Sequence, residues 1–328
     1  FGVLIDFTAL FQEPRTAEEN DVFLCGLPAL HLFYSHPETL VFKITQFPDG
    51  YPHHDAFHYD LPEGANTAVY DERGWCFAES SMSGLVKCSS KVLDLSRESG
   101  DPVSLERVIS RCKSVRELPL RPDEFNKELS RKTFSNSKAD SDRVAKLYSA
   151  AFERRLGSAS ELDFSGVAWG GPEEVQRLFQ VLQGNSSLRT LKLGRSYMKD
   201  PGAAALGKFV EGHRSLQTLA LGMNSVQDEG AVALGKALER NRSLTTLDLT
   251  NNLVGDDGAV ALGNALKSNY SLTTLDLTGN FVGDQGAAAL GQALQRNGSL
   301  RQLVLEDNVV EDDGAMALAE ALKKNSAL

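Results

Sequence analysis

The chain contains 328 residues, which is enough for two domains that each bury a hydrophobic core. Hydrophobic residues make up 41% and charged residues 24% of the chain, which excludes a wholly disordered protein. The net charge is −10, so we expect neither nucleic acid nor an anionic membrane surface as the main partner. The four cysteines form no CxxC pair, which favours reduced thiols in an intracellular compartment. The longest apolar run, residues 22–34, contains Pro28 and is too short for membrane insertion.

Residues 1–96 alternate between strand and helix patterns. Strand patterns cover residues 2–7, 39–47, 66–70 and 91–95, and helical patterns cover residues 17–34 and 72–87. Strands that alternate with helices predict an open parallel α/β sheet of the flavodoxin-like kind. The chain begins at Phe1 rather than Met and ends at Leu328 inside a repeat unit. We therefore expect a longer natural protein, with an N-terminal domain that begins before Phe1.

A tryptophan–cysteine motif lies at the start of the helix predicted over residues 72–87. Residues 70–79 read Tyr-Asp-Glu-Arg-Gly-Trp-Cys-Phe-Ala-Glu. This segment resembles the WCxxE box of Toll/interleukin-1 receptor (TIR) domains of plants and of TIR-like domains in protist proteins. In enzymatic TIR domains the glutamate of the box catalyses NAD hydrolysis, so the resemblance implies a catalytic Glu79 and a role for NAD. A structural alternative places Glu79 in the first helical turn, where an acid is favourable beside the helix dipole.

A histidine-rich segment at residues 51–58 raises the question of a metal site. Proline and glycine residues around it favour a surface loop, and its spacing matches no known ligand set, so we expect no metal. The sequence contains no Walker loop, GxSxG elbow or GxGxxG motif. We therefore expect no cofactor, except NAD under the enzymatic alternative.

Residues 97–158 carry three short helical patterns, at 104–112, 122–129 and 140–155. In the last pattern five apolar residues fall on one face of the helix: Val144, Leu147, Tyr148, Ala151 and Phe152. We expect this helix to cap the open apolar edge of the repeats that follow. We also expect residues 132–138 to form a flexible hinge.

A repeat with a period of 28 residues dominates the second half of the chain. From Leu188 onward, three leucine columns and one asparagine column give the pattern LxxLxLxxN, and an earlier copy at Leu162 is one residue out of step. Each unit continues with Asp-x-Gly and a run of Ala, Leu and Gly, which predicts a helix that the Asp of the same unit caps. Stacked strand–turn–helix units, about six in number, predict a curved solenoid with the parallel strands inside.

This pattern resembles the leucine-rich-repeat family, in its ribonuclease-inhibitor-like class. The resemblance covers residues 162–328 and implies protein–protein interaction through the concave face. The turn consensus Asn-x-Ser-Leu also creates four N-glycosylation sequons, and we expect these asparagines to be structural.

Positions beside the strand leucines point toward the concave face and supply the candidate binding residues. They change from basic in the first full unit to acidic in the last three, which fits a protein partner with a basic patch. The candidates are Lys192, Arg195, Met223, Asp248, Asn251, Asp276, Glu306 and Asp307, with Tyr197 and Phe281 as aromatic anchors. In the alternative interpretation these are solvated consensus residues, and the two aromatic rings pack against the next turn.

The sequence thus predicts an intracellular, non-enzymatic scaffold or adaptor in three parts. These are a TIR-like α/β domain at residues 1–96, a helical connector and cap at 97–158, and leucine-rich repeats at 159–328. Two alternatives stay open. One is a TIR-type NAD hydrolase with the repeats as sensor, and the other is a structural subunit of a large multiprotein complex in the cytoplasm or on an organelle.

Overall fold

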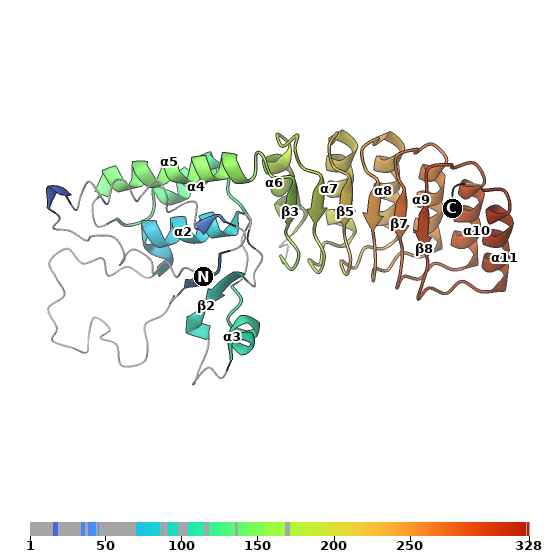
Figure 1. Cartoon of the computed structure of the whole chain (residues 1–328), viewed down its shortest axis with the longest axis horizontal. Coiled ribbons are helices and arrows are strands. Elements are labelled where there is room, and N and C mark those ends of the chain that lie inside the picture. The colour runs from blue at the N-terminus through green and yellow to red at the C-terminus, as the bar shows by residue number, and fades with distance from the viewer. Residues whose placement is uncertain are drawn as a thin grey trace. The chain divides into compact units, whose positions relative to one another are not determined.

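The computed structural model describes residues 16–18, 34–36, 39–43, 45, 70–85, 87, 91–97, 104–114, 118–134, 137–167, 171–325 and 327. The chain divides into two compact units, Phe1–Arg155 and Leu156–Leu328 (Figure 1). The strand expected at residues 2–7 and the histidine-rich segment at 51–58 lie outside the described residues. Of the helix expected at 17–34, Ala17, Glu18 and Tyr34 are helical, and the other residues are not described.

Two described strands of the N-terminal unit form a parallel pair. Strand β1 (Val41–Lys43) pairs with β2 (Val92–Asp94), with Phe42 opposite Leu93. The parallel arrangement expected for residues 39–47 and 91–95 is therefore confirmed. The chain between them includes helix α2 (Gly74–Gly84), and the short 3-10 helix η2 (Tyr70–Glu72) begins at Tyr70, where we expected the end of a strand.

The core of this unit contains aromatic side chains from three helices. Helices α4 (Pro122–Leu129) and α5 (Ser137–Arg155) pack together, and both pack against α2. The Tyr148 ring stacks on Phe125 with ring centroids 3.7 Å apart, and Phe77 stacks on the same ring at 5.1 Å. Burial raises the pKa of Tyr148, whose hydroxyl donates a hydrogen bond to the Leu120 carbonyl at 2.7 Å. The apolar face expected for residues 140–155 is thus buried within this unit, whereas its role as a cap stays a prediction.

Part of the segment expected to form a hinge, residues 132–138, pairs with a segment that is distant in the sequence. The backbone N–H of Thr133 donates to the Glu72 carbonyl, and the N–H of Gly74 donates to the Thr133 carbonyl, each at 2.8 Å. The Phe134 ring lies directly over Gly74, where a Cβ atom would come within 2.0 Å of it. Lys138 already belongs to α5. Thr133 and Phe134 therefore make long-range contacts that composition alone does not reveal, and the hinge stays a prediction. Helix α3 (Leu105–Arg111) and the 3-10 helix η4 (Leu95–Arg97) complete the described elements of the unit.

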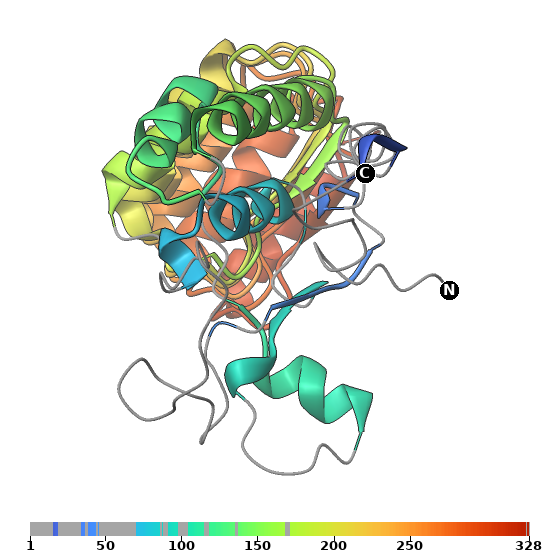
Figure 2. The ribbon, with the colours of Figure 1, turned by 90° about the vertical axis from the view of Figure 1, so that its left-hand side faces the viewer.

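The C-terminal unit is an array of strands and helices that alternate along the chain. Its described strands are β3 (Glu161–Asp163), β4 (Thr190–Lys192), β5 (Thr218–Ala220), β6 (Thr246–Asp248), β7 (Thr274–Asp276) and β8 (Gln302–Val304). Its described helices are α6 (Pro172–Leu182), α7 (Lys199–Gly212), α8 (Asp228–Arg240), α9 (Asp256–Leu266), α10 (Asp284–Leu294) and α11 (Asp312–Leu322). The strands form one parallel sheet in chain order, and the helices stack in a separate layer (Figure 2).

The strand register follows the sequence period. Leu191 pairs with Leu219 and Leu247 pairs with Leu275, each 28 residues apart, while Leu162 pairs with Leu191. The first copy is therefore one residue out of step, as expected. These five leucines are at most 2% exposed, which identifies the strand leucines as the shared core of the array.

Two columns of buried asparagines join each unit to the one before it. The Asn252 side chain donates to the carbonyls of Leu221 at 3.1 Å and Leu249 at 2.9 Å. Asn269, from a sequon, donates to the carbonyls of Leu238 at 2.8 Å and Asn241 at 3.0 Å. The sequon asparagines are at most 2% exposed: Asn185, Asn241, Asn269 and Asn297. Their amides satisfy buried backbone groups, so these sequons are structural features of the turns.

The aspartates that recur every 28 residues act on a different helix from the one expected. Asp228 is the first residue of α8, yet its Oδ1 accepts hydrogen bonds from the N–H groups of Gly255 at 2.7 Å and Gly258 at 2.9 Å, at the start of α9. Asp256 binds the start of α10 in the same way, through Gly283 and Gly286. Capping of the helix in the same unit, as expected from sequence, is therefore wrong, because the aspartate caps the helix of the next unit at four positions: Asp200, Asp228, Asp256 and Asp284.

The glycine of the Asp-x-Gly motif has a steric explanation in this arrangement. A Cβ atom added to Gly258 would lie 2.8 Å from Asp228 Oδ1 and 2.9 Å from Ala231 Cβ. The motif thus has two roles. Its aspartate accepts hydrogen bonds from the start of the following helix, and its glycine leaves room for the aspartate of the preceding unit.

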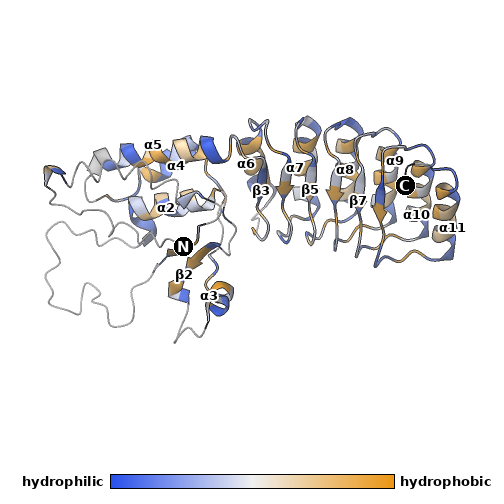
Figure 3. Cartoon of the chain, viewed as in Figure 1, coloured by the Kyte–Doolittle hydropathy of each residue, from blue (hydrophilic) through white to orange (hydrophobic). Residues whose placement is uncertain are grey.

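No helix in the described part of the chain is long and apolar enough to cross a membrane. The longest described helix, α5, mixes hydrophilic and hydrophobic residues along its whole length (Figure 3).

Candidate protein-interaction surface

The strand side of the array presents the columns that the sequence predicted. Thr218 lies beside Thr246 on neighbouring strands, and Asp248 lies beside Asp276. Neighbouring strands are about 4.8 Å apart, so the two aspartates form adjacent negative charges on one surface. Val304 follows Asp276 in this column, and the acidic surface continues at Glu306 and Asp307, which are exposed.

Asp248 and Asp276 each use one carboxylate oxygen to stabilise the turn that follows the strand. Asp248 Oδ1 accepts hydrogen bonds from the Thr250 N–H at 2.9 Å and the Thr250 hydroxyl at 2.8 Å. Asp276 Oδ1 accepts from the N–H and hydroxyl of Thr278 at 2.9 and 2.6 Å. Both carboxylates are half-buried and held in one orientation. They therefore combine a structural role with a fixed charge on the surface.

The basic end of the surface is neutralised by an ion pair. Lys192 Nζ lies 2.6 Å from Glu161 Oε1 on the neighbouring strand. The hydrogen bond that Lys192 donates to Glu161 raises the pKa of Lys192, and the charge of Asp163 adds to this effect. Arg195 is exposed in the turn beyond the strand. The strand side is consequently more acidic than the sequence columns alone indicate.

A column of left-handed residues follows the strands. Its members have φ between 52° and 68°: Arg195, Met223, Asn251, Gly279 and Asp307. The Met223 N–H donates to the Thr250 carbonyl at 2.9 Å, and the Asn251 N–H donates to the Thr278 carbonyl at 2.7 Å. Glycine and asparagine accept this conformation readily, whereas Arg195 and Met223 carry a strain of about 1–2 kcal/mol each. Hydrogen bonds to the next unit thus hold the turns of Arg195, Met223, Asn251 and Gly279, and the long side chains of Arg195 and Met223 are exposed.

Exposed apolar side chains line the loops two residues beyond that column. Tyr197 is 71%, Leu253 42%, Phe281 56% and Val309 56% exposed, and they share the 28-residue period, which the half-buried Ser225 interrupts between Tyr197 and Leu253. We call these four residues the apolar rim. Tyr197 and Phe281 are therefore mostly exposed, which favours their assignment as anchors over packing against the next turn, and that assignment stays a prediction. Sequence analysis missed Leu253 and Val309, although the period that contains Tyr197 and Phe281 also contains them.

The backbone of the apolar rim is held by hydrogen bonds to the preceding unit. The N–H groups of Leu253 and Phe281 donate to the carbonyls of Val226 and Val254 at 2.8 and 2.9 Å. The N–H of Val309 donates to the Val282 carbonyl at 3.0 Å. The rim is therefore an ordered apolar surface beside the acidic columns, which is a typical arrangement for protein recognition.

Glu79 in the N-terminal unit lies in the second turn of α2 and is 6% exposed. Since the helix begins at Gly74, the interpretation of Glu79 as a first-turn acid is wrong. The catalytic assignment of Glu79 stays a prediction from the resemblance to TIR domains.

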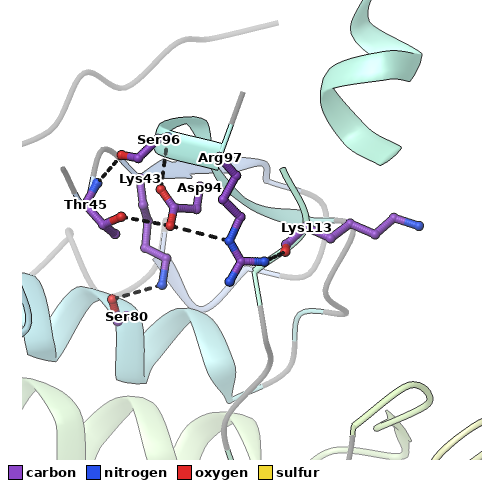
Figure 4. Close-up of polar contacts among 7 residues, drawn as sticks. All are labelled: Lys43, Thr45, Ser80, Asp94, Ser96, Arg97 and Lys113. Atoms are coloured by element: carbon purple, nitrogen blue, oxygen red, sulfur yellow. Dashed lines mark hydrogen bonds and ion pairs between the residues drawn. The ribbon is translucent and has the colours of Figure 1, made fainter. Parts of the chain in front are cut away.

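A polar cluster surrounds Asp94 at the carboxyl end of β2 (Figure 4). Its Oδ2 accepts from the Thr45 hydroxyl at 2.8 Å and lies 3.7 Å from Arg97 Nε, while Oδ1 accepts from the Ser96 N–H at 3.1 Å. Arg97 also donates to the Lys113 carbonyl at 2.5 Å. Ligands often bind at the carboxyl ends of parallel strands. Here both carboxylate oxygens of Asp94 already interact with groups of the same chain, which indicates that the cluster is structural.

Among the described residues, no group of three His, Cys, Asp or Glu side chains is arranged to hold a metal ion. Cys112 is a buried free thiol, and Cys76 is half-buried in α2. Cys25 and Cys88 lie outside the described residues.

Comparison with known proteins agrees with this architecture. Residues 212–235, 240–263, 268–291 and 296–319 match the family model for the Leucine Rich repeat. The C-terminal unit is a leucine-rich-repeat solenoid.

Two solved structures are similar to the chain, and each is covered over most of its length. Actin-Binding Site 2 of leiomodin-1 is 16% identical, with 54% of this chain and 86% of that chain covered and a TM-score of 0.35. The C-terminal domain of tropomodulin from Caenorhabditis elegans is 13% identical, with 54% and 89% covered and a TM-score of 0.33. No curated protein matched the sequence.

Proposed function

We propose that this chain is an intracellular scaffold or adaptor whose leucine-rich repeats bind a protein partner that carries a basic patch. The observation that supports this most directly is the apolar rim beside the acidic columns of the strand side. A row of exposed apolar side chains on an ordered backbone is uncommon on a surface that faces only water.

The rim offers the hydrophobic part of such an interface. Tyr197 and Phe281 are the largest of its side chains, and aromatic residues are enriched among those that dominate binding energy. Because hydrogen bonds between units already hold the loop backbone, binding requires little further ordering of the chain.

The acidic columns offer the electrostatic part. Asp248, Asp276, Glu306 and Asp307 belong to three successive units, and the ion pair of Lys192 neutralises one of the two basic residues at the other end, the second being Arg195. Such a surface attracts a basic protein and accelerates its association, and it repels nucleic acid.

Site-specific photo-crosslinking in native cells tests this proposal. A photoreactive phenylalanine analogue replaces Phe281 on the rim, and in a second version it replaces Gln292, which is exposed on helix α10. We expect a protein partner to be captured from position 281 and not from position 292. Equal capture from both positions would contradict the proposal. It would favour the alternative in which the chain is a structural subunit of a large multiprotein complex and has neighbours on all sides.

Charge neutralisation provides the second arm of the experiment. The combined variant Asp248→Asn, Asp276→Asn, Glu306→Gln and Asp307→Asn keeps the hydrogen-bond acceptors for Thr250 and Thr278 while removing four charges. The control variant removes four exposed charges from the helices: Glu229→Gln, Glu239→Gln, Asp257→Asn and Asp313→Asn. We expect capture at position 281 to fall only in the first variant. Unchanged capture in that variant would show that the acidic columns are merely solvated.

A further inference from the structure

The contact between α6 and α7 departs from the repeat at three positions. At the repeat position that Phe179 occupies in α6, the next four helices carry a glycine: Gly207, Gly235, Gly263 and Gly291. Where Phe209 lies in α7, they carry Ala237, Ala265, Ala293 and Ala321. His213 occupies the position of the buried asparagines of the other turns. Three larger rings thus replace small or amide side chains at one contact between neighbouring helices.

The glycine at this position normally allows two helices to touch. A Cβ atom on Gly235 would lie 3.1 Å from the Ala261 carbonyl oxygen of the next helix, and Gly207 and Gly263 make the same approach at 3.0 and 3.1 Å. A phenylalanine cannot make this contact. Instead the Phe179 ring stacks on Phe209 at 4.7 Å, and Phe209 lies 4.8 Å from the His213 ring. The rings therefore act as a wedge between α6 and α7.

A groove of about 410 Å³ opens beside this wedge. Its lining includes Phe179, which is 6% exposed, and three exposed glutamines, namely Gln176 and Gln180 of α6 and Gln183 directly after the helix. This volume lies in the lower part of the range of clefts that hold small ligands. The glutamines share one side of the helix over about 10 Å, which equals the length of roughly three residues of extended chain.

The charge of the groove is the opposite of that of the chain. Lys208 is the only charged residue among those that line it, in a protein with a net charge of −10. Glu211, one turn further along α7, forms an ion pair with Arg240 at 2.6 Å. The groove therefore combines an aromatic floor, amide groups that can pair with a peptide backbone, and one cation.

We propose that this groove binds a short extended segment of a protein partner that carries an aromatic or leucine side chain next to an aspartate or glutamate. The apolar side chain packs on Phe179 and Phe209, the segment's backbone amides pair with the glutamine side chains, and its carboxylate pairs with Lys208. This site lies in the helix layer and prefers an acidic ligand, so it is distinct from the acidic strand side and its basic partner. The chain then has two interaction surfaces, one that prefers a basic partner and one that prefers an acidic segment.

Selection from a random heptapeptide phage library on the immobilised full chain tests this proposal. The test variant is Lys208→Glu, and the matched control is Lys236→Glu, which changes the exposed lysine at the same position of α8. We expect the parent and the Lys236→Glu control to enrich peptides with an aromatic or leucine residue beside an acid. Synthetic copies of these peptides should bind the Lys208→Glu variant at least about fivefold more weakly.

A second variant removes the wedge rather than the charge. Phe179→Gly with Phe209→Ala restores the residues that pack closely in the later units, and its circular dichroism spectrum verifies that the helices persist. We expect the selected peptides to lose at least about tenfold in affinity for this variant. The proposal is overturned if the library yields no such peptides, or if the selected peptides bind all variants as tightly as the parent.

Discussion

The aspartates that cap the following helix allow a direct test of how the units are joined. Asp228→Ala removes one carboxylate oxygen that accepts two N–H bonds, from Gly255 at 2.7 Å and Gly258 at 2.9 Å. Loss of a helix cap costs about 0.5–2 kcal/mol, and hydrogen bonds to a charged group lie at the upper end of such values. We therefore expect Asp228→Ala to lower the free energy of unfolding by about 2 kcal/mol. Asp228→Asn keeps an acceptor and should cost about half as much.

Asp312 provides the matched control for this prediction. It is the first residue of α11, as Asp228 is of α8, but within the described residues no helix follows α11. Asp312→Ala therefore removes only the favourable interaction with its own helix dipole, about 0.3–1 kcal/mol. Urea unfolding followed by circular dichroism measures both variants, and faster amide exchange at Gly255 and Gly258 locates the effect of Asp228→Ala. Equal losses in the two variants would refute capping between units and restore capping within a unit.

Three further predictions concern the core, a buried histidine and Glu79. Leu249→Asp should unfold the array, because Leu249 is fully buried and an unpaired carboxylate there has no partner; a thermal melt identical to that of the parent would contradict this. His213 accepts a hydrogen bond from the Leu216 N–H at 3.2 Å, and burial lowers its pKa, so the unfolded chain binds a proton first. Stability should therefore be full above about pH 6.5 and fall on acidification, and His213→Asn should flatten this slope in urea midpoints measured across that range; equal slopes would exclude His213 as the cause. Finally, because Glu79 is buried within α2, we expect the purified chain to leave NAD intact; hydrolysis that disappears in Glu79→Gln would support the catalytic assignment instead.

The sequence alone was sufficient for the architecture of the repeats. Leucines and asparagines at a constant period of 28 residues determine which residues pair, because every unit repeats the same local strand, turn and helix. The parallel pairing of β1 with β2 was also predictable from the alternation of strand and helix patterns. Of the candidate binding residues, the positions of Asp248 and Asp276 on adjacent strands followed directly from this register.

Only the tertiary structure decided which groups act across the boundary between units. Asp228 reaches the start of α9, whose N-cap residue Gly255 lies 27 residues later, Lys192 is neutralised by Glu161 on another strand, and Phe134 packs over Gly74 in a segment that resembled a hinge. The sequence period shows that these residues recur or stand near a turn, but not toward which neighbour each side chain points. Exposure of the apolar rim and the wedge of Phe179 likewise depend on the shape of the adjacent unit. Local patterns therefore predicted the scaffold, whereas the surfaces available for binding arise from packing between units.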